Sequence, residues 1–306
     1  MNAARLLDLY DRVADTPDAI DRLRRFVIDL AVRGKLVEQD PTDEPASELA
    51  ALIRAVRVVR NSNLPDSWCH TRVGEILDFR YGKGLKVSER MDAGPVPVYG
   101  SNGIVGYTDE PLTTRPSVIV GRKGSAGALN KCDRSSWTTD VAYFVEAPRF
   151  FDLDFLYLSL VAVDLKHLAK GVKPGLSRSD AYRQTISVPP LAEQHRIVVK
   201  VSELVALCDQ LEETRAERED IRDRLTKANL ARLTAPDTDE PTFRGHARFA
   251  IHALPALTAR ADQVKYLRQA ILSLAVRGKL VEQDPADEPA SELLEQIAVK
   301  KAQLLK

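Results

Sequence analysis

Residues 30–49 read LAVRGKLVEQDPTDEPASEL, and residues 274–293 read LAVRGKLVEQDPADEPASEL. The two stretches differ only at Thr42 and Ala286, and their offset is 274 − 30 = 244 residues. Solenoid and propeller units recur every ~20–50 residues, so a period this long is that of a whole module. We therefore expect one full unit followed by the opening of a second.

Composition sets broad limits on the class of protein. The 306 residues include 44 Lys and Arg against 44 Asp and Glu, so net charge favours neither nucleic acid nor an anionic membrane. No apolar run approaches the ~20 residues that cross a bilayer, and the N-terminus lacks the layout of a signal peptide, which predicts a cytoplasmic protein without a membrane partner. Cys69, Cys132 and Cys208 show no CxxC spacing, which favours three reduced thiols over a disulfide framework or a zinc site.

Residues 1–60 have a helical pattern and form the first expected region. Apolar side chains recur there at three- and four-residue steps, namely Ile20, Leu23, Val27, Leu30 and Ala31. Gly34 is a plausible stop signal, and the proline-containing turn at 40–45 interrupts the helix because proline removes a backbone donor. A second helix is expected at 46–60.

Residues 61–190 have the texture of a compact, mostly β domain. Short apolar or β-branched runs alternate with turn residues, and the clearest predicted strands are 96–99, 117–120 and 141–145. Nine of the 15 glycines fall between residues 82 and 127, which is typical of a loop-rich domain. A short helix is expected at 151–168.

Residues 191–234 are predicted to form one long helix. The segment 191–233 contains neither Gly nor Pro, and at ~1.5 Å per residue it would be roughly 60–65 Å long. Apolar residues step by four and three, as in a coiled coil, at Ile197, Val201, Leu204, Cys208 and Leu211. This line of apolar residues, the seam of the predicted coiled coil, is interrupted after Leu211 and resumes at Ile221 and Leu225.

The last two regions are a linker and a second helical region. Residues 235–261 contain three prolines and a glycine, which predicts a linker. Residues 262–306 repeat residues 18–62, with Leu267, Ile271 and Leu274 on the expected packing face. The predicted fold class is α+β, with one globular, mostly β domain and long helices that form an antiparallel coiled-coil spacer.

Catalytic motifs are missing from the sequence. Residues 121–127 lack both the GK[ST] ending of a P-loop and a GxSxG frame, and residues 81–84 lack the third glycine of a dinucleotide site. Residues 188–191 lack the Asn or Asp and the aromatic residue that flank the proline pair of amino-methyltransferases. The five histidines show no metal-ligand spacing. We expect a chain that is not an enzyme and holds no metal or cofactor of its own.

Basic residues nevertheless gather in the glycine-bearing loops of the β domain. Three clusters are apparent: Arg80, Lys83, Lys86 and Arg90; Arg115, Arg122, Lys123, Lys131 and Arg134; and Lys166, Lys170, Lys173, Arg178 and Arg183. Arg and Lys contact phosphate or guanine, and Asn pairs with adenine, so these residue types suit DNA readout. A solvated surface of ordinary composition explains the clusters equally well.

Four segments resemble a target recognition domain of the Type I restriction-modification specificity subunit. They are DSW at 66–68, YGSNGI at 99–104, VGRKGSAG at 120–127 and VPPLAEQHRIV at 188–198. The duplicated stretch resembles the conserved helical region of that family. The resemblance implies a DNA-recognition subunit whose partners are double-stranded DNA, a methyltransferase subunit that uses S-adenosylmethionine, and a restriction (motor-nuclease) subunit.

In that family a full-length subunit carries two recognition domains, each reading half of a split site, held apart by two antiparallel helices. This sequence has one such domain, so it resembles a half-subunit, or a chain truncated at the start of its second domain. A half-subunit is expected to form a homodimer that reads an inverted repeat. The rod is long enough for domains at its ends to read half-sites about one ~34 Å turn apart.

The residues predicted to face DNA are Lys83, Lys86, Tyr99, Ser101, Asn102, Arg122, Lys123, Lys173 and Arg178. The predicted helix-packing or dimer residues are Ile197, Val201, Leu204, Cys208, Leu211, Leu267, Ile271 and Leu274. Two alternatives stay open. One is a helical scaffold whose β domain binds protein, and the other is a nuclease, for which the isolated Asp164-Leu165-Lys166 is thin support.

Overall fold

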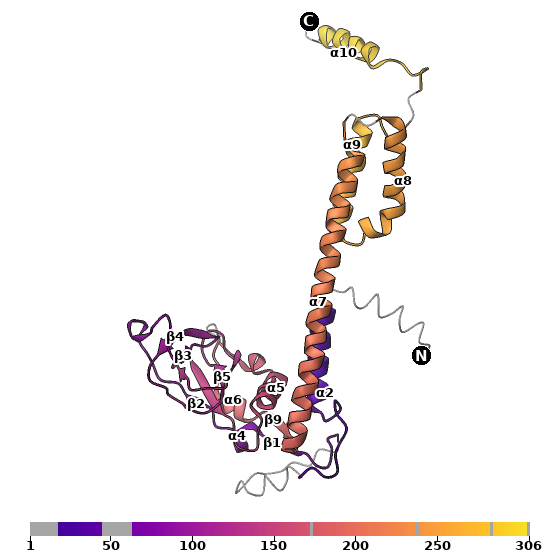
Figure 1. Cartoon of the computed structure of the whole chain (residues 1–306). Coiled ribbons are helices and arrows are strands. Elements are labelled where there is room, and N and C mark those ends of the chain that lie inside the picture. Colours follow the sequence, from indigo (N-terminus) through magenta and orange to yellow (C-terminus); the bar gives the residue numbers. More distant parts are fainter. Residues whose placement is uncertain (1–17, 45–62, 172–173, 237–238, 282–283, 305–306) are drawn as a thin grey trace. The chain divides into compact units, whose positions relative to one another are not determined.

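The computed structural model describes residues 18–44, 63–171, 174–236, 239–281 and 284–304 (Figure 1). The chain divides into two compact units, Met1–Leu211 and Glu212–Lys306, with the boundary inside helix α7 (Leu191–Leu233). This helix has 43 residues and confirms the prediction of one long helix. The second helix expected at 46–60 lies outside the described residues.

Three small sheets build the β-rich part of the first unit. Antiparallel strands β1 (Cys69–Arg72) and β9 (Thr185–Val188) form one sheet. The second has the order β2 (Arg80–Tyr81), β8 (Ala142–Glu146), β5 (Ser117–Gly121) and β6 (Leu129–Cys132). The third has the order β4 (Ile104–Thr108), β3 (Val96–Tyr99) and β7 (Trp137–Thr138), in which β3 and β7 are parallel. The three strands predicted from apolar runs are confirmed as β3, β5 and β8.

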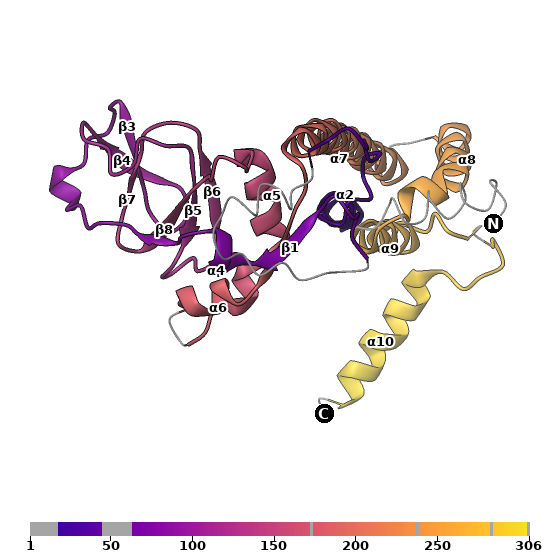
Figure 2. The ribbon, with the colours of Figure 1, turned by 90° about the horizontal axis from the view of Figure 1, so that it is seen from below.

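Short helices connect and cover these sheets. Their bounds are α4 (Val73–Ile76), η1 (Val87–Glu89), α5 (Leu153–Val163), η2 (Leu165–Leu168) and α6 (Arg178–Tyr182). The single helix expected at 151–168 is interrupted because Asp164 adopts a left-handed conformation with φ +52° and ends α5. In Figure 2, helix α5 lies between helix α2 (Ala19–Val32) and strands β5 and β6 of the four-stranded sheet. Helix α5 contacts α2 and both strands.

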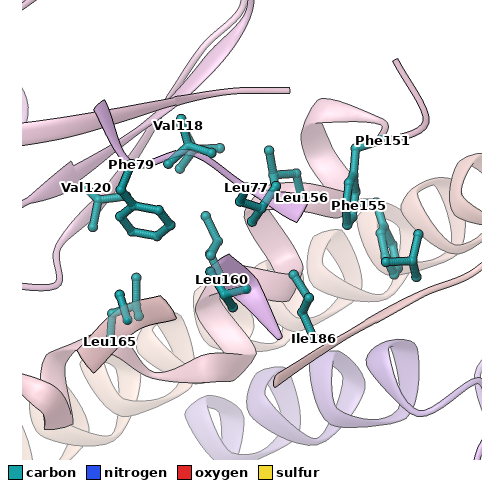
Figure 3. Packing of buried hydrophobic residues seen from close by; sticks show 14 of the residues in the cluster. Leu77, Phe79, Val118, Val120, Phe151, Phe155, Leu156, Leu160, Leu165 and Ile186 are labelled. Carbon is teal, nitrogen blue, oxygen red and sulfur yellow. The ribbon is translucent and has the colours of Figure 1, made fainter. Parts of the chain in front are cut away.

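Strand β5 separates two apolar clusters because successive side chains point to opposite faces. Val118 and Val120 join the main core, into which α5 inserts Leu156 and Leu160 (Figure 3). Ile119 points the other way and packs in a second cluster with Tyr99, Cys132 and Ala142. Each fully buried Leu or Ile of this kind stabilises the fold by about 1.5–3 kcal/mol. Apolar contact on both faces explains why β5 and β8 are apolar runs instead of alternating ones.

The first copy of the repeated stretch is fastened to the start of α7 through Glu193. This carboxylate is buried, and its two oxygens accept hydrogen bonds from Gln39 Nε2 at 2.6 Å and from the indole Nε1 of Trp68 at 2.9 Å. Arg196, one turn later, donates two hydrogen bonds to the carboxylate of Asp43. The contacts join the repeat, the DSW segment and the AEQHR segment into one structure.

Gln194 ties the same end of α7 to the β-rich part. Its Oε1 accepts from the backbone N–H of Asp152 at 2.8 Å. Its Nε2 donates to the carbonyls of Phe150, at 2.9 Å, and Pro189, at 3.0 Å. Because the oxygen and the nitrogen of this buried side-chain amide both have hydrogen-bond partners, the amide fixes the direction in which α7 leaves the domain.

In the second unit, the predicted linker at 235–261 is wrong for most of its length. Helix α8 (Glu240–Leu257) occupies it, followed by α9 (Ala261–Val276) and α10 (Ala290–Leu304). Asp239 caps α8, and Pro241 lies in the first turn, where a missing N–H is tolerated. Pro255 lies near the C-terminal end, so neither proline interrupts the helix centre.

The predicted packing residues of α7 are covered as far as Cys208, whereas the prediction for Leu211 is wrong. Ile197, Val201 and Cys208 are buried, Leu204 is half-buried and Leu211 is exposed. The seam is predicted to resume at Ile221 and Leu225. The prediction for Ile221 is wrong, because this side chain is 59% exposed, whereas Leu225 is half-buried. Thr226, Asn229 and Leu233 are buried instead.

The second copy of the repeat buries a different helix face from the first. Helix α2 buries Val27 and Ala31, whereas their equivalents in α9, Ile271 and Ala275, are exposed. Helix α9 instead buries Ala270 and Leu274, and Leu267 is half-buried. The predicted packing face at Leu267, Ile271 and Leu274 is therefore only partly covered in the described chain. No helix among the described residues is long and apolar enough to span a membrane.

Replacing Trp68 with Phe tests the buried carboxylate. Burial raises the pKa of Glu193, and the hydrogen bonds from Gln39 and Trp68 oppose that rise by favouring the charged form. Trp68→Phe removes a donor to a charged group and should lower the free energy of unfolding by about 1.5–3 kcal/mol at neutral pH.

The loss should shrink as the pH falls and Glu193 becomes protonated, because the indole bond stabilises only the carboxylate strongly. The measurement is urea unfolding followed by circular dichroism at several pH values. Trp137→Phe is the matched control, since Trp137 Nε1 donates to a neutral acceptor, the carbonyl of Lys83, at 2.9 Å. Equal, pH-independent losses in the two variants would contradict the role of Glu193.

Candidate nucleic-acid interface

An exposed tyrosine at the end of β2 is flanked by two arginines. The side chain of Tyr81 is 50% exposed. The guanidinium carbon of Arg122 lies 4.9 Å from the centroid of its ring, and that of Arg178 lies 5.2 Å from it. Both distances are within the ~6 Å of a cation–π contact. We call these three residues the Tyr81 cluster.

Strand pairing places Tyr81 and Arg122 together. Tyr81 is opposite Tyr143 on β8, with ring centroids 5.1 Å apart, and Tyr143 is opposite Val120 on β5. Arg122 follows Val120 by two residues, which returns its side chain to the same face. The sheet therefore fixes the first arginine against the tyrosine ring.

Hydrogen bonds bring Arg178 to the same place. The backbone N–H of Leu176 donates to the carbonyl of Arg122 at 2.9 Å. The hydroxyl of Tyr143 donates to the carbonyl of Leu176 at 3.1 Å. Arg178 opens α6 two residues later, so three distant segments converge on one ring.

The loop at 138–141 adds two lysines to this surface. Thr138 accepts from the backbone N–H of Lys83 at 2.8 Å, and Val141 accepts from that of Lys123 at 3.0 Å. The carbonyl of Asp140 also accepts from Arg122 Nη1 at 3.1 Å. Lys83 and Lys123 are therefore held by the same loop that anchors Arg122.

Glycines allow these close approaches. A Cβ on Gly82 would lie 2.1 Å from the carbonyl oxygen of Thr139, and one on Gly121 would lie 2.4 Å from that of Ser101. The second contact places Ser101 beside the loop that carries Arg122 and Lys123. The glycines are needed for backbone packing, which accounts for their density here.

The basic side chains of this surface have no carboxylate partner in the described chain, unlike five other basic residues of the three clusters. Arg80 and Arg115 pair with Glu146, Lys131 pairs with Asp154, and Lys170 and Arg183 pair with Asp180. Hydrogen bonds from Lys170 and Arg183 hold the pKa of Asp180 below its usual value. Within the part of the chain that the structure describes, no carboxylate pairs with Lys83, Arg122, Lys123 or Arg178.

Three further predicted DNA-facing residues are described outside the Tyr81 cluster, and a fourth is not described. Tyr99 is only 8% exposed, and burial raises the pKa of its hydroxyl to about 12, so its prediction as a surface residue is wrong. Asn102 borders a cleft of about 780 Å³ that is also lined by α2 and α5. Lys86 stands at the start of η1. Lys173 lies outside the described residues.

Sequence reasoning also missed Tyr81. Its position beside Arg80 and Lys83, at the end of a short strand and before two glycines, was the available signal.

Support for a catalytic site is weak in the described residues. They contain no group of three or more His, Cys, Asp or Glu side chains placed to hold a metal ion. Asp164 ends α5 and lies 3.4 Å from His167, an ordinary helix-end contact. The arginines and the tyrosine ring of the Tyr81 cluster can bind an anionic or aromatic ligand.

Comparison with known proteins identifies relatives for nearly the whole chain. Residues 65–218 match the family described as the Type I restriction modification DNA specificity domain. The specificity subunit of Type I restriction enzyme EcoAI from Escherichia coli is 30% identical over 98% of this chain and 57% of that protein. The EcoEI specificity subunit from the same organism is 29% identical with the same coverage. The chain thus spans just over half the length of these curated relatives.

A crystal structure is also similar to this chain. The S subunit of a Type I restriction-modification system from M. genitalium matches 72% of this chain and 58% of its own, with 23% sequence identity and a TM-score of 0.44.

Two neighbouring glycines offer a test of how the interface is built. Gly82→Ala should lower the free energy of unfolding by about 1–3 kcal/mol, because the new methyl group meets the backbone carbonyls of Thr138 and Thr139. Gly84→Ala is the matched control, since its nearest neighbour is an Asp140 oxygen at 3.8 Å. Thermal unfolding of both variants measures the difference, and equal stability would contradict the close packing of β2 on this loop.

Proposed function

Because the chain belongs to the Type I restriction-modification DNA specificity family, we propose that its β-rich domain recognises a sequence in double-stranded DNA. The observation that carries this proposal is the Tyr81 cluster with Lys83 and Lys123, a basic surface without carboxylate partners in the described chain. Lysines of this kind suit phosphates, and arginines suit phosphates or base edges. Net charge is zero, so attraction to DNA would come from this local surface.

The proposed role is recognition without catalysis. The domain would read one half of a bipartite site, and the helices would dock a methyltransferase subunit and, through it, a restriction subunit. S-adenosylmethionine would bind to the methyltransferase and not to this chain. A cytoplasmic location follows from these partners.

We also propose that the chain forms a two-fold homodimer through its C-terminal helical region. Ile271 is 45% exposed and Val281 is 73% exposed, whereas their equivalents in the first copy, Val27 and Val37, pack in the core. A two-fold contact would let the same apolar patch cover itself on both chains. Identical domains would then read an inverted repeat.

DNA binding is tested by selecting the full chain against a pool of random duplexes. We expect one enriched sequence and an affinity that falls with salt, with a slope of about −0.9 per phosphate contacted. Lys83→Ala with Lys123→Ala should lower affinity for all sequences and flatten that slope, because both are proposed as phosphate contacts. Lys131→Ala is the control, since Lys131 already pairs with Asp154. Binding of a protein partner, with no enriched sequence and no salt dependence, would favour the scaffold alternative.

Dimerisation is tested by sedimentation of the same full chain. The wild type should sediment as a dimer, and Ile271→Asp with Val281→Asp should give a monomer of unchanged helix content, because burying a charge in an apolar contact is unfavourable. Val87→Asp, at another exposed apolar residue, should leave the dimer intact. A wild type that stays monomeric, free and with its methyltransferase, would overturn this proposal.

A further inference from the structure

The two arginines of the Tyr81 cluster differ in how many of their guanidinium N–H groups already donate hydrogen bonds. Arg122 is half-buried and donates from Nη1 to the carbonyl of Asp140 at 3.1 Å. Arg178 is exposed, and within the described chain its guanidinium makes contacts only with rings: Tyr81 at 5.2 Å and Tyr182 at 5.7 Å. Arg178 therefore has its guanidinium N–H groups available while its position is held.

Both rings that hold Arg178 are themselves anchored on one short segment. The hydroxyl of Tyr182 accepts from the backbone N–H of Phe79 at 3.0 Å and donates to Asp78 at 3.1 Å. Tyr81 follows two residues later and is fixed by its pairing with Tyr143. The segment 78–81 thus positions two aromatic faces against a single guanidinium.

A contact between the guanidinium carbon and a ring makes no hydrogen bond, so it leaves the N–H edge of the guanidinium uncommitted. That edge is a rigid fork of N–H donors that matches the O6 and N7 acceptors of guanine in the major groove. A guanidinium whose position is already restricted by two rings loses less conformational freedom when it binds a base. A phosphate needs only a nearby positive charge, which Lys83 and Lys123 supply.

Arg80 shows that stacking on a ring is not sufficient. Its guanidinium carbon lies 4.9 Å from the centroid of Phe144, but Nη1 pairs with Glu146 at 3.1 Å. The charge of Arg80, the residue immediately before Tyr81, is therefore neutralised by a carboxylate although its ring contact is similar. Arg178 differs from Arg80 because its guanidinium pairs with no carboxylate in the described chain.

We propose that Arg178 reads a guanine of the recognised sequence and that Tyr81 is its positioning residue. This inference rests on the proposed DNA-reading function. It adds which base is read, that Arg178 reads it, and that the ring of Tyr81 orients Arg178.

The test compares sequence preference, and not affinity alone, among variants of the full chain. The wild-type sequence selected from random duplexes should contain an invariant guanine. Arg178→Ala should weaken binding to that sequence roughly 10- to 100-fold and remove the preference at that one base pair, leaving the other positions intact. Arg80→Ala should leave the preference unchanged at every position.

Tyr81 variants separate positioning from folding. Tyr81→Ala should relax the same base pair as Arg178→Ala, with a smaller loss of affinity, and Tyr81→Phe should restore the preference because the ring face remains. Thermal unfolding of each variant controls for damage to the fold.

Three results would overturn the inference. A loss in Arg178→Ala that is uniform across sequences would make Arg178 a phosphate contact, and no loss would remove it from the interface. A loss in Tyr81→Ala spread over all positions would remove the positioning role. A wild type that binds no DNA would instead refute the proposed function, so the two failures are distinguishable.

Discussion

The buried carboxylate of Glu193 is the constraint on which the first unit depends. A charge without hydrogen-bond partners is very unfavourable in a protein interior, so both oxygens must find donors. Gln39 supplies one from the repeated stretch, and Trp68 supplies the other from the entrance of the β-rich domain. Glu193 itself begins the long helix. Three segments far apart in sequence must therefore assemble together, and the ion pair of Arg196 with Asp43 strengthens the same junction.

This junction separates the scaffold from the surface that would meet DNA. Strands β1 and β9 pair along their whole length, so the chain enters and leaves the β-rich domain at one place. The Tyr81 cluster comes from the segments between them, each fixed by strand pairing or by backbone hydrogen bonds. The side chains of Tyr81 and Arg178 are exposed, and that of Arg122 is half-buried, so the cluster contributes little to the apolar core. Such residues can change without loss of the fold, which suits a protein that must read a particular sequence.

Sequence patterns correctly predicted the helices and strands whose formation depends least on contacts with the rest of the protein. The long helix follows from a run without Gly or Pro, and β3, β5 and β8 follow from apolar runs. Tyr99 was misplaced because an aromatic residue before a glycine turn looks exposed until its strand pairing is known. Tyr81 was missed because its exposure is set by the register of β2 on β8. Helix α8 was missed because proline was interpreted without regard to its position in a helix turn, although a first-turn proline is compatible with a helix.

The two copies of the helical region show how the surroundings of a helix affect the face that it buries. Residues 30–49 and 274–293 differ at one position, but only the last three residues of α2 and of α9 lie inside these stretches. Most aligned positions differ over the rest of the two helices, and the helices bury adjacent faces. Helix α2 packs on α5, which offers an apolar surface to Val27 and Ala31. Helix α9 instead directs Gln263 to Asp223 of α7, at 3.1 Å, beside the ion pair of Arg260 with the same carboxylate. These polar contacts lie at the start of α9, and on the same helix Ala270 and Leu274 are buried while Ile271 is exposed. Both helices are amphipathic, and the side of each that is buried depends on the residues that differ between them, such as Phe26 against Ala270, together with the neighbouring element.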